Sequence, residues 1–329
     1  GVMEHIEEAG IHSGDSSCTL PPITLGPDII AKVKDATEKI ARGTGVRGLI
    51  NIQFAYVSEN LYVIEANPRA SRTVPFVSKA TGVQMAKAAV LIGLGKSIAE
   101  LKAEGYLPQN MDGASLPEET AIAVKAAVLP FARFRTPEGV VVDSLLSPEM
   151  RSTGEVMGLD KHYDTAFAKA QAGAGSPMPT SGKVFISVAN HDKRNVIIYA
   201  KMLESLGFEI VSTGGTAEIL RRNGLNSVLV ASKFAEANGD HSIVDMVRNG
   251  DIDLILNTPA GGAARSDGYE IRAAAVSVGC PVMTTISEFA AAVQAINALR
   301  EHSWDIMSLQ EHGVQLAAAV DARSEGGEA

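Results

Sequence analysis

Two neighbouring strand-like segments carry the side chains whose types and spacing best suit chemistry. The sequence predicts strands over Leu49–Val57 and Leu61–Asn67, joined by a three-residue turn. Because side chains alternate between the two faces of a strand, this register places Gln53 opposite Glu65 and Asn67 one step along the same face. Carboxylate and amide groups therefore gather at one end of the predicted hairpin.

Such oxygen donors suit a hard cation. Mg²⁺ and Mn²⁺ prefer carboxylate and carbonyl oxygens, and Mg²⁺ usually takes only one or two carboxylates together with substrate phosphates. The same spacing is also typical of the solvated face of an edge hairpin, so spacing alone leaves both alternatives open. The opposite face is apolar and is predicted to be a core face, with Ile50, Ile52, Phe54, Tyr56, Tyr62, Ile64 and Ala66.

Two arginines follow the second strand. Pro68 ends the strand, and Arg69 and Arg72 come directly after it. Guanidinium groups beside a carboxylate–metal centre can hold phosphate oxygens or the charge that develops during phosphoryl transfer. Single surface arginines are common, so the whole run EANPRASR is more specific than either residue.

The elements around this hairpin are predicted from periodicity and stop signals. A segment over Ala121–Val128 fits either a strand or a helix. Helices are predicted over Asp28–Arg42, where Gly43 ends the helix, over Thr81–Leu94 and over Asp164–Ala170.

A stretch rich in Gly, Ala, Pro and Ser, Ala170–Gly182, is predicted to be a linker because it has little to bury. After it, strands and helices alternate, which indicates a mostly parallel, doubly wound sheet. The predicted strands are Val184–Ala189, Phe208–Ser212, Val228–Ala231, Leu254–Asn257 and Pro281–Thr284; the predicted helices are 193–206, with Asp192 as its cap and Gly207 as its stop, Thr216–Asn223, Ile243–Arg248 and Ser287–Leu299.

A second candidate site lies in this later region. The run Thr213-Gly214-Gly215-Thr216 sits between a strand and a helix start, where free N–H groups and the helix dipole favour a phosphate. Gly-rich turns without ligands are frequent, so the run alone is a weak signal. Lys193 begins the first helix and Asn257 ends another strand, and strand ends of a parallel sheet converge on one crevice.

Composition bounds the function. A chain of 329 residues has room for about two domains. The formal net charge of −9 disfavours nucleic acid or an anionic membrane as the main partner. Cys18 and Cys280 are isolated, no apolar run reaches the ~18 residues of a membrane span, and the first residues lack a signal-peptide pattern, so we expect a cytoplasmic protein. The abrupt start is predicted to be a cut within a strand.

Three long motifs resemble one known family. EANPRASRTVPFVSKATG, with MEHIEEAGIHSGDS upstream and SPEMRSTGEVMG downstream, closely resembles the second ATP-grasp half of the carbamoyl-phosphate synthetase large chain, and the similarity runs through nearly all 329 residues. The resemblance implies a partial ATP-grasp fold (α+β, antiparallel sheet) followed by a doubly wound, methylglyoxal-synthase-like domain. The implied boundaries are 1–95 for the ATP and metal site, 96–172 for an associated extension, 173–182 for a linker and 183–329 for the allosteric domain.

The resemblance also implies an activity. In this family the second ATP-grasp unit phosphorylates carbamate, which derives from bicarbonate, with ATP to give carbamoyl phosphate for arginine and pyrimidine synthesis. It implies a glutamine-hydrolysing ligase with a small glutaminase subunit, assembled as an oligomer of heterodimers. The family's Gly-rich loop and lysine that cover the phosphates lie upstream of this sequence, so we expect this chain alone not to turn over ATP.

Site residues carry over by motif. Gln53, Glu65 and Asn67 match the Mg²⁺ or Mn²⁺ ligands, and Gln53 and Glu65 also match ATP contacts. Arg69 and Arg72 match the arginines that hold the phosphorylated intermediate. A polar loop bounded by glycine matches a nucleotide-lining loop, through Gly10, Ile11, His12 and Ser13.

The later region matches a regulatory domain that binds a nucleotide effector, UMP or IMP, through Lys193, Thr213, Thr216, Lys233 and Asn257. Two departures stand out. Pro259 follows Thr258 where the family commonly has a second threonine, and Ala126 replaces a glutamate that binds the activator ornithine. Other ornithine contacts are matched by Glu7, Asp15 and Thr284, so we expect weak or absent ornithine activation.

Three alternatives remain. One is another ATP-grasp ligase, such as a biotin-dependent carboxylase. Another is a stand-alone nucleotide-sensing module without catalysis. The third is a methylglyoxal synthase, although no catalytic aspartate pattern accompanies the phosphate turn and Asp192 is better explained as a helix cap.

Overall fold

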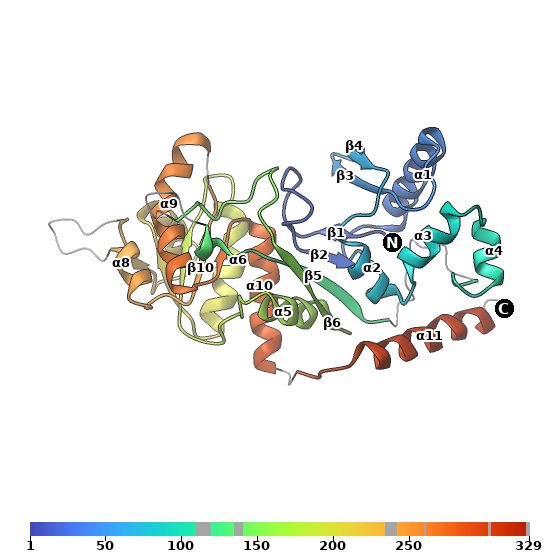
Figure 1. Cartoon of the computed structure of the whole chain (residues 1–329). Helices are drawn as coiled ribbons and strands as arrows, with labels where there is room; N and C mark the ends of the chain where they lie inside the picture. The colour runs from blue at the N-terminus through green and yellow to red at the C-terminus, as the bar shows by residue number, and fades with distance from the viewer. Residues whose placement is uncertain (110–119, 135–140, 234–241, 260, 302–303, 327–329) are drawn as a thin grey trace.

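The computed structural model describes residues 1–109, 120–134, 141–233, 242–259, 261–301 and 304–326. It contains a four-stranded antiparallel sheet, a separate two-stranded hairpin and a five-stranded parallel sheet (Figure 1). The mixed fold predicted from the sequence, antiparallel first and parallel second, is confirmed.

The antiparallel sheet has the strand order β1-β2-β5-β6. Its strands are β1 (Glu4–His5), β2 (Cys18–Leu20), β5 (Ile122–Val128) and β6 (Gly154–Asp160). The open choice at 121–128 is thus settled as a strand, and it is buried from Ala123 to Ala127. Strands β1 and β2 belong to the predicted unit 1–95, and strands β5 and β6 belong to the predicted extension 96–172. All four share this one sheet.

Helices surround the first part of the chain. They are α1 (Pro27–Thr44), α2 (Val74–Thr81), α3 (Met85–Gly93), α4 (Ile98–Ala103) and the short 3₁₀ turn η1 (Phe131–Arg133). Two predicted helix boundaries were wrong here. α1 continues past Gly43 and ends at Gly45, whose φ of 64° provides the left-handed cap. The predicted helix 81–94 is split, because Gly82 adopts a φ of 70° and ends α2.

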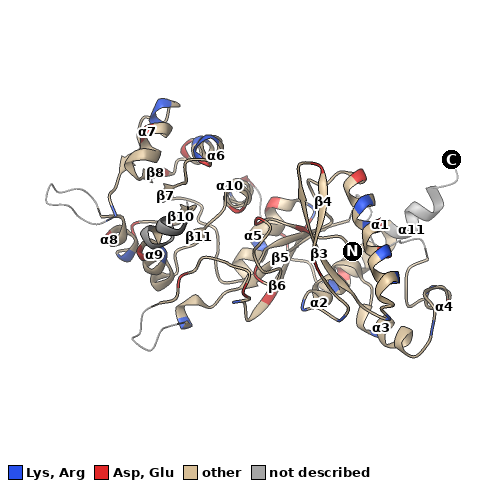
Figure 2. Ribbon diagram, turned by 90° about the horizontal axis from the view of Figure 1, so that it is seen from above, with Lys and Arg blue, Asp and Glu red and all other residues tan. Residues whose placement is uncertain are grey.

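The helix α5 (Tyr163–Gly173) lies between the two large sheets (Figure 2). Gly158 allows it to approach β6, since an added Cβ would overlap the carbonyl oxygen of Ala166. Phe167 and Ala170 of α5 share one hydrophobic core with residues of the parallel sheet. The start of the predicted linker is therefore helical, and Met178 within it is buried in the same core.

The parallel sheet has the strand order β11-β10-β7-β8-β9. Its strands are β7 (Lys183–Ser187), β8 (Glu209–Ser212), β9 (Leu229–Val230), β10 (Leu254–Asn257) and β11 (Val282–Met283). The helices are α6 (Lys193–Ser205), α7 (Gly214–Arg222), α8 (Ile243–Arg248), α9 (Gly261–Val278) and α10 (Ile286–Glu301).

Alternate residues of these strands enter two separate cores. Ile186 and Leu256 pack with α6, α7 and α10, whereas Phe185 and Ile255 pack with α8 and α9. Helices on both faces are what a doubly wound sheet requires, and the prediction is confirmed. The helix α9 was not predicted from the sequence.

The last helix, α11 (Leu309–Gly326), returns to the first part of the chain (Figure 1). Leu316 packs with Phe76 and Ala80 of α2, and His312 Nε2 lies 3.2 Å from the carbonyl oxygen of Ala80. In the described residues no helix is long and apolar enough to cross a membrane.

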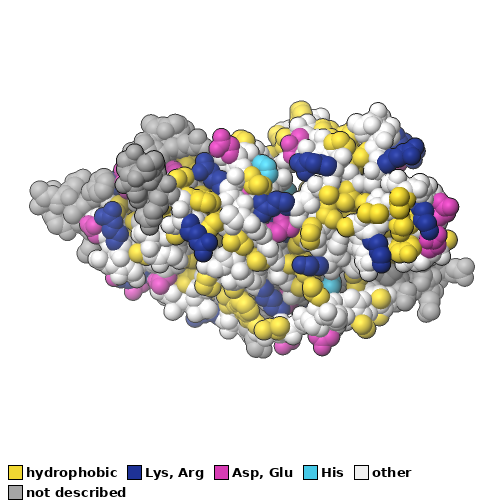
Figure 3. Space-filling view, viewed as in Figure 1, with side chains coloured by type: hydrophobic (Ala, Val, Ile, Leu, Met, Phe, Trp, Pro, Cys, Tyr) yellow, Lys and Arg dark blue, Asp and Glu magenta, His cyan; other side chains and the backbone are white. Residues whose placement is uncertain are grey.

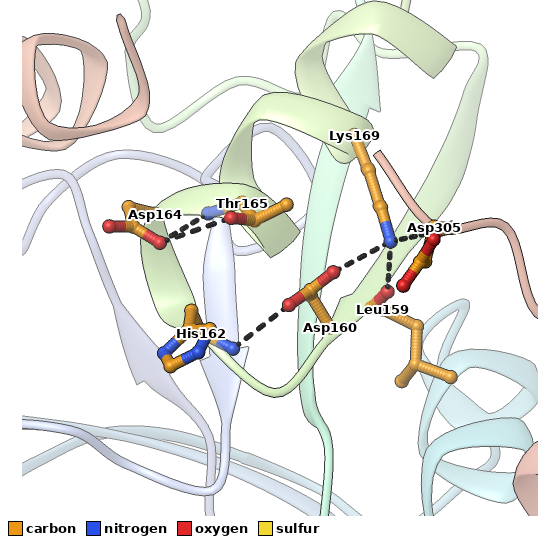
Figure 4. Close-up of polar contacts among 7 residues, drawn as sticks. All are labelled: Leu159, Asp160, His162, Asp164, Thr165, Lys169 and Asp305. Atoms are coloured by element: carbon orange, nitrogen blue, oxygen red, sulfur yellow. Dashed lines mark hydrogen bonds and ion pairs between the residues drawn. The ribbon is translucent and has the colours of Figure 1, made fainter. Parts of the chain in front are cut away.

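Hydrophobic side chains also remain at the surface of the N-terminal half (Figure 3). They include Val90 and Leu94 at the end of α3, and Ile98 in α4. The segment that leads into α11 is held by Lys169, whose ammonium contacts Asp160 and the carbonyl oxygens of Leu159 and Asp305 (Figure 4).

Candidate functional site

The hairpin consists of β3 (Asn51–Val57) and β4 (Asn60–Asn67), and its polar end has the predicted register. Asn51 pairs with Asn67, and Gln53 pairs with Glu65. Asn67 Nδ2 donates a hydrogen bond of 3.0 Å to Glu65 Oε1. One carboxylate and the amides beside it therefore lie together, as predicted.

The turn, however, differs from the prediction. Ser58 and Glu59 alone form it, with positive φ angles of 48° and 65°, the geometry of a two-residue hairpin turn. This would shift the register by one residue, but a bulge between Gln53 and Phe54 restores it, so that Phe54 pairs with Val63. The three-residue turn was wrong, and the pairing at the polar end was right.

The apolar face of the hairpin is not a core face in this structure. No residue of β3 or β4 is buried, and Tyr62 and Ile64 are 56% and 48% exposed. The neighbouring helix α1 also has no buried residue. The prediction of a core face was wrong, because the described chain covers Ile52 and Phe54 only in part and leaves Tyr62 and Ile64 exposed.

The donor set of the hairpin suits a cation that also binds phosphate. It offers one carboxylate and amide oxygens, few protein charges for a divalent ion, which matches sites where Mg²⁺ keeps substrate phosphate ligands. Within the described residues, no group of three or more His, Cys, Asp or Glu side chains could hold a metal by itself. Gln53, Glu65 and Asn67 thus fit a metal brought by a nucleotide better than a protein-only metal cage.

Arg69 and Arg72 take different positions. The backbone N–H of Arg69 donates to the carbonyl oxygen of Asn67 over 2.8 Å, which keeps Arg69 next to the polar end of the hairpin. Arg72 Nη1 donates to the carbonyl oxygen and to Oγ of Ser152, each over 3.1 Å. Arg72 is therefore anchored to the segment before β6.

The loop Gly10–Ser13 is fixed by two contacts near its C-terminal end. The N–H of His12 donates to the carbonyl oxygen of Ser147 over 2.9 Å, and the ammonium of Lys125 donates to the carbonyl oxygen of Ser13 over 3.0 Å. Lys125 is fully buried, so this bond anchors the loop to the centre of the sheet. Gly10 has a φ of 107°, a conformation that favours glycine.

Ser152 joins this loop to Arg72. Its hydroxyl donates to the carbonyl oxygen of Gly14 over 3.0 Å while accepting from Arg72. The structure thus brings Arg72 and the loop together. In the described part of the chain, no hydrogen bond or ion pair joins either one to the side chains of Gln53, Glu65 and Asn67.

A pair of carboxyl groups, the buried Glu7 and the half-buried Glu288, lies where the two sheets meet. Burial raises the pKa of Glu7 to about 7, against the lowering effect of Lys125. Burial and the charge of Glu7 raise the pKa of Glu288, in α10, to about 8. Glu288 accepts a hydrogen bond of 3.1 Å from the N–H of Thr284, and Glu7 Oε2 has no hydrogen-bond partner among the described groups.

Sequence reasoning matched Glu7 and Thr284 but missed Glu288. The pattern Thr285-x-x-Glu288 was an available signal, since it is typical of a helix start. Indeed, the N–H of Glu288 donates to Thr285 Oγ1 over 3.1 Å. Asp15, the remaining predicted effector contact, accepts the N–H groups of Arg151 and Ser152 over 2.8 and 2.9 Å.

The phosphate-type turn of the parallel sheet is assembled as predicted. Thr213 is the N-cap residue of α7, and its hydroxyl lies 3.1 Å from that of Ser187 at the end of β7. Lys193 reaches the turn from the start of α6, since its Nζ would lie 3.4 Å from a Cβ added to Gly215. A cation and a helix N-terminus therefore converge on one point, where a phosphate is favoured.

The other predicted effector residues are held in place by neighbours. Thr216 Oγ1 accepts the N–H of Val188 over 3.4 Å. Lys233 forms an ion pair of 2.7 Å with Glu270, and Asn257 Oδ1 accepts from Arg272 over 2.6 Å. Asp192 occupies the N-cap position of α6 but makes no side-chain capping bond, so its predicted capping role was wrong.

Comparisons with known proteins match the two parts of the chain to two different families. Residues 1–101 match the family described as "Carbamoyl-phosphate synthase L chain, ATP binding domain". Residues 195–284 match the family described as "MGS-like domain". The first match covers the hairpin, both arginines and the loop Gly10–Ser13, and the second covers the turn at Thr213.

Relatives extend along nearly the whole chain. The "Carbamoyl phosphate synthase large chain" of Kocuria rhizophila is 70% identical over 314 residues, 95% of this chain and 28% of the relative. Those of Micrococcus luteus and Streptomyces coelicolor are 66% and 58% identical, over 97% and 98% of this chain and 29% of each relative. The chain thus spans less than a third of the length of these relatives.

Among solved structures, the "Biotin Carboxylase domain of single-chain bacterial carboxylase" aligns with 49% of this chain and 39% of its own. The identity is 22% and the TM-score is 0.34, too distant a likeness to bear on function.

Proposed function

We propose, for a chain that corresponds to the C-terminal part of a carbamoyl phosphate synthase large chain, that its hairpin and arginines serve the phosphorylation of carbamate by ATP. The carrying observation is the pairing of Gln53 with Glu65, with Asn67 hydrogen-bonded to the same carboxylate. The family match and the relatives support an ATP-binding role for this part of the chain.

The residues of the chain suggest a division of labour. Gln53, Glu65 and Asn67 would hold Mg²⁺ or Mn²⁺, which would neutralise the charge of the nucleotide phosphates. A carbamate oxygen attacks the γ-phosphorus of ATP, the bond to the bridging oxygen breaks, and ADP leaves with that oxygen. Arg69 and Arg72 stabilise the negative charge on the transferred group. Arg72 is preorganised for this role because Ser152 fixes its guanidinium.

Glu65→Gln in the full-length large chain with its small subunit tests this proposal. We expect the loss of on the order of 10²-fold or more in ATP formed from ADP and carbamoyl phosphate, the reverse of the proposed step. Glu59→Gln, in the turn of the same hairpin, is the matched control and should retain activity. Retention of activity by Glu65→Gln would contradict the proposal.

We also propose that the later region binds a nucleotide effector, UMP or IMP, through Lys193, Thr213, Thr216, Lys233 and Asn257. The convergence of Lys193 on the turn before α7 supports a phosphate there. Calorimetric titration of the large chain with UMP and IMP tests this, and Lys193→Ala should weaken binding. Absence of binding by both nucleotides would contradict it.

Ornithine, by contrast, should activate weakly or not at all. Glu7 and Thr284 lie at the meeting point of the sheets, and both oxygens of Asp15 already accept backbone N–H groups. The matched glutamate is also replaced by Ala126. A strong ornithine response that Asp15→Ala abolishes would contradict this expectation.

We also propose the wider assignment that the resemblance implies, which extends beyond this chain. It comprises a glutamine-hydrolysing, cytoplasmic ligase with a small glutaminase subunit, an oligomer of heterodimers, and a product used in arginine and pyrimidine synthesis. A biotin-dependent carboxylase is disfavoured by the match of residues 195–284 to an MGS-like domain.

A further inference from the structure

A fully buried arginine lies behind the proposed nucleotide site. Arg272 in α9 has no exposed side-chain surface, and its Nε and Nη2 each donate to Asp143 over 2.7 Å. Its Nη1 donates to Asn257 Oδ1 over 2.6 Å. One guanidinium therefore connects an aspartate of the segment before β6 with an asparagine at the end of β10.

These bonds determine what Asn257 can offer to a ligand. Because Arg272 donates to Oδ1, the amide is held with its NH₂ group as the free donor end, which suits phosphate or ribose oxygens. Gly268 makes this arrangement possible, since an added Cβ would overlap both Arg272 Nη1 and Asn257 Oδ1. Asn257 Nδ2 has one long contact, 3.4 Å, to the carbonyl oxygen of Ser187.

The segment 141–152 reaches the proposed ATP site at its other end. Near Asp143 it is also held by Tyr269, whose hydroxyl donates to the carbonyl oxygen of Val141 over 2.6 Å. Further along, Ser147 accepts the N–H of His12, and Ser152 accepts from Arg72. This one segment touches α9 beside the nucleotide site, the loop Gly10–Ser13 and a proposed catalytic arginine.

We propose that segment 141–152 couples the nucleotide site to the carbamate-phosphorylating site, with the Asp143–Arg272–Asn257 contacts as its link to the regulatory region. Arg272 and Asp143 are positioning residues that touch neither substrate. The coupling rests on the proposed role of Asn257 as a nucleotide contact.

The physical basis is that the link moves as a unit. The buried Arg272 cannot easily separate from Asp143, because separation would leave its charge without the two hydrogen bonds that hold it away from water. A ligand that pulls on the Asn257 amide therefore displaces Arg272 and Asp143 together, and the short segment carries that displacement to His12 and Arg72. Reciprocity requires that ATP alter effector affinity by the same factor.

The test uses the full-length large chain with its small subunit and measures ATP affinity with and without saturating UMP or IMP. Asp143→Asn keeps the shape of the side chain and removes its charge. We expect it to bind the nucleotide within about threefold of wild type, while the ratio of the two ATP affinities falls to about 1. Gly268→Ala, which displaces the link from within α9, should lower the same ratio.

Asp160→Asn is the matched control. Asp160 also accepts a hydrogen bond from a largely buried cation, Lys169, but it lies outside the Asp143–Arg272–Asn257 link (Figure 4). It should leave the ratio unchanged. An unaltered ratio in Asp143→Asn, an equal loss in Asp160→Asn, or a ratio of 1 in the wild type would each overturn the coupling.

Amide hydrogen exchange separates failure of the coupling from failure of the proposed nucleotide site. If neither UMP nor IMP binds the wild type, the effector assignment fails. The link is still tested without effector, since Asp143→Asn should speed exchange in residues 10–16 and Asp160→Asn should not. Equal exchange in the two variants would overturn it.

Discussion

The hairpin β3–β4 and the parallel sheet differ in what fixes them. Ile64 of β4 is 48% exposed, whereas Ile255 of β10 is fully buried between the sheet and α8 and α9. The parallel sheet carries its own helices on both faces. The hairpin register is set by a tight turn and a bulge, with no core of its own. The chemistry proposed for this chain thus lies on the loosely packed hairpin. The proposed regulation lies on the well-packed parallel sheet.

The largest expected effect concerns activity. We expect the isolated 329-residue chain to release no ADP in the presence of carbamate and ATP above the level without protein. Glu65 is exposed, and phosphoryl transfer needs a site from which water is excluded. Carbamate-dependent ADP release by the isolated chain would show that the hairpin region is sufficient by itself.

Next comes stability. Phe289→Ala in α10 should lower the free energy of unfolding by about 3–5 kcal/mol, because Phe289 is fully buried and packs edge-on against Tyr199. Ile64→Ala should cost less than about 0.5 kcal/mol. Urea unfolding of both variants measures the difference. Similar losses in the two would mean that the hairpin is as well packed as the parallel sheet.

A smaller effect depends on pH, at the place where the two regions meet. Glu7 and Glu288 have raised pKa values, about 7 and about 8, so the folded chain binds more protons than the unfolded chain above about pH 5. The free energy of unfolding should therefore fall as pH rises from about 5 to about 8.

Glu7→Gln should flatten this slope, and Glu218→Gln on the exposed face of α7 should leave it unchanged. Denaturant unfolding at a series of pH values provides the measurement. A slope in Glu7→Gln equal to that of the wild type would rule out the carboxyl pair as its origin.

The smallest effect concerns the turn. Ser58 and Glu59 both have positive φ angles, which Asn-Gly adopts with less strain. Replacing the pair with Asn-Gly should raise the free energy of unfolding by about 0.4–1 kcal/mol without changing the pairing of Gln53 with Glu65. Thermal unfolding and the activity assay measure the two effects. A loss of activity would show that the turn also sets the polar end.

Local signals predicted the parallel region well. Helix Ile243–Arg248 and strand Leu254–Asn257 have the expected boundaries, since their apolar runs and stop residues are unambiguous. The helix α9 was missed because its first residues, rich in Gly and Ala, carry no apolar period. At the hairpin, the polar pairing was predicted for the wrong turn, because a bulge cannot be inferred from alternation.

Contacts between distant segments could not be predicted. Glu288, Arg272 and Asp143 acquire their significance from neighbours far away in sequence, such as Glu7 for the first. A single sequence shows the type of each residue and leaves these partners open. The resemblance identified only residues that match the family's motifs. It therefore missed Glu288, Arg272 and Asp143, whose importance comes from how this chain packs.

The return of α11 to α2 bears on how the chain would respond to cleavage. Met178 apart, residues 174–182 are mostly at least partly exposed, and they form a natural place for a protease to act. A single cut there would break the backbone, yet Leu316 and His312 would still hold α2, and α5 would still share its core with α10. We expect the two pieces to remain associated and to separate only under denaturing conditions.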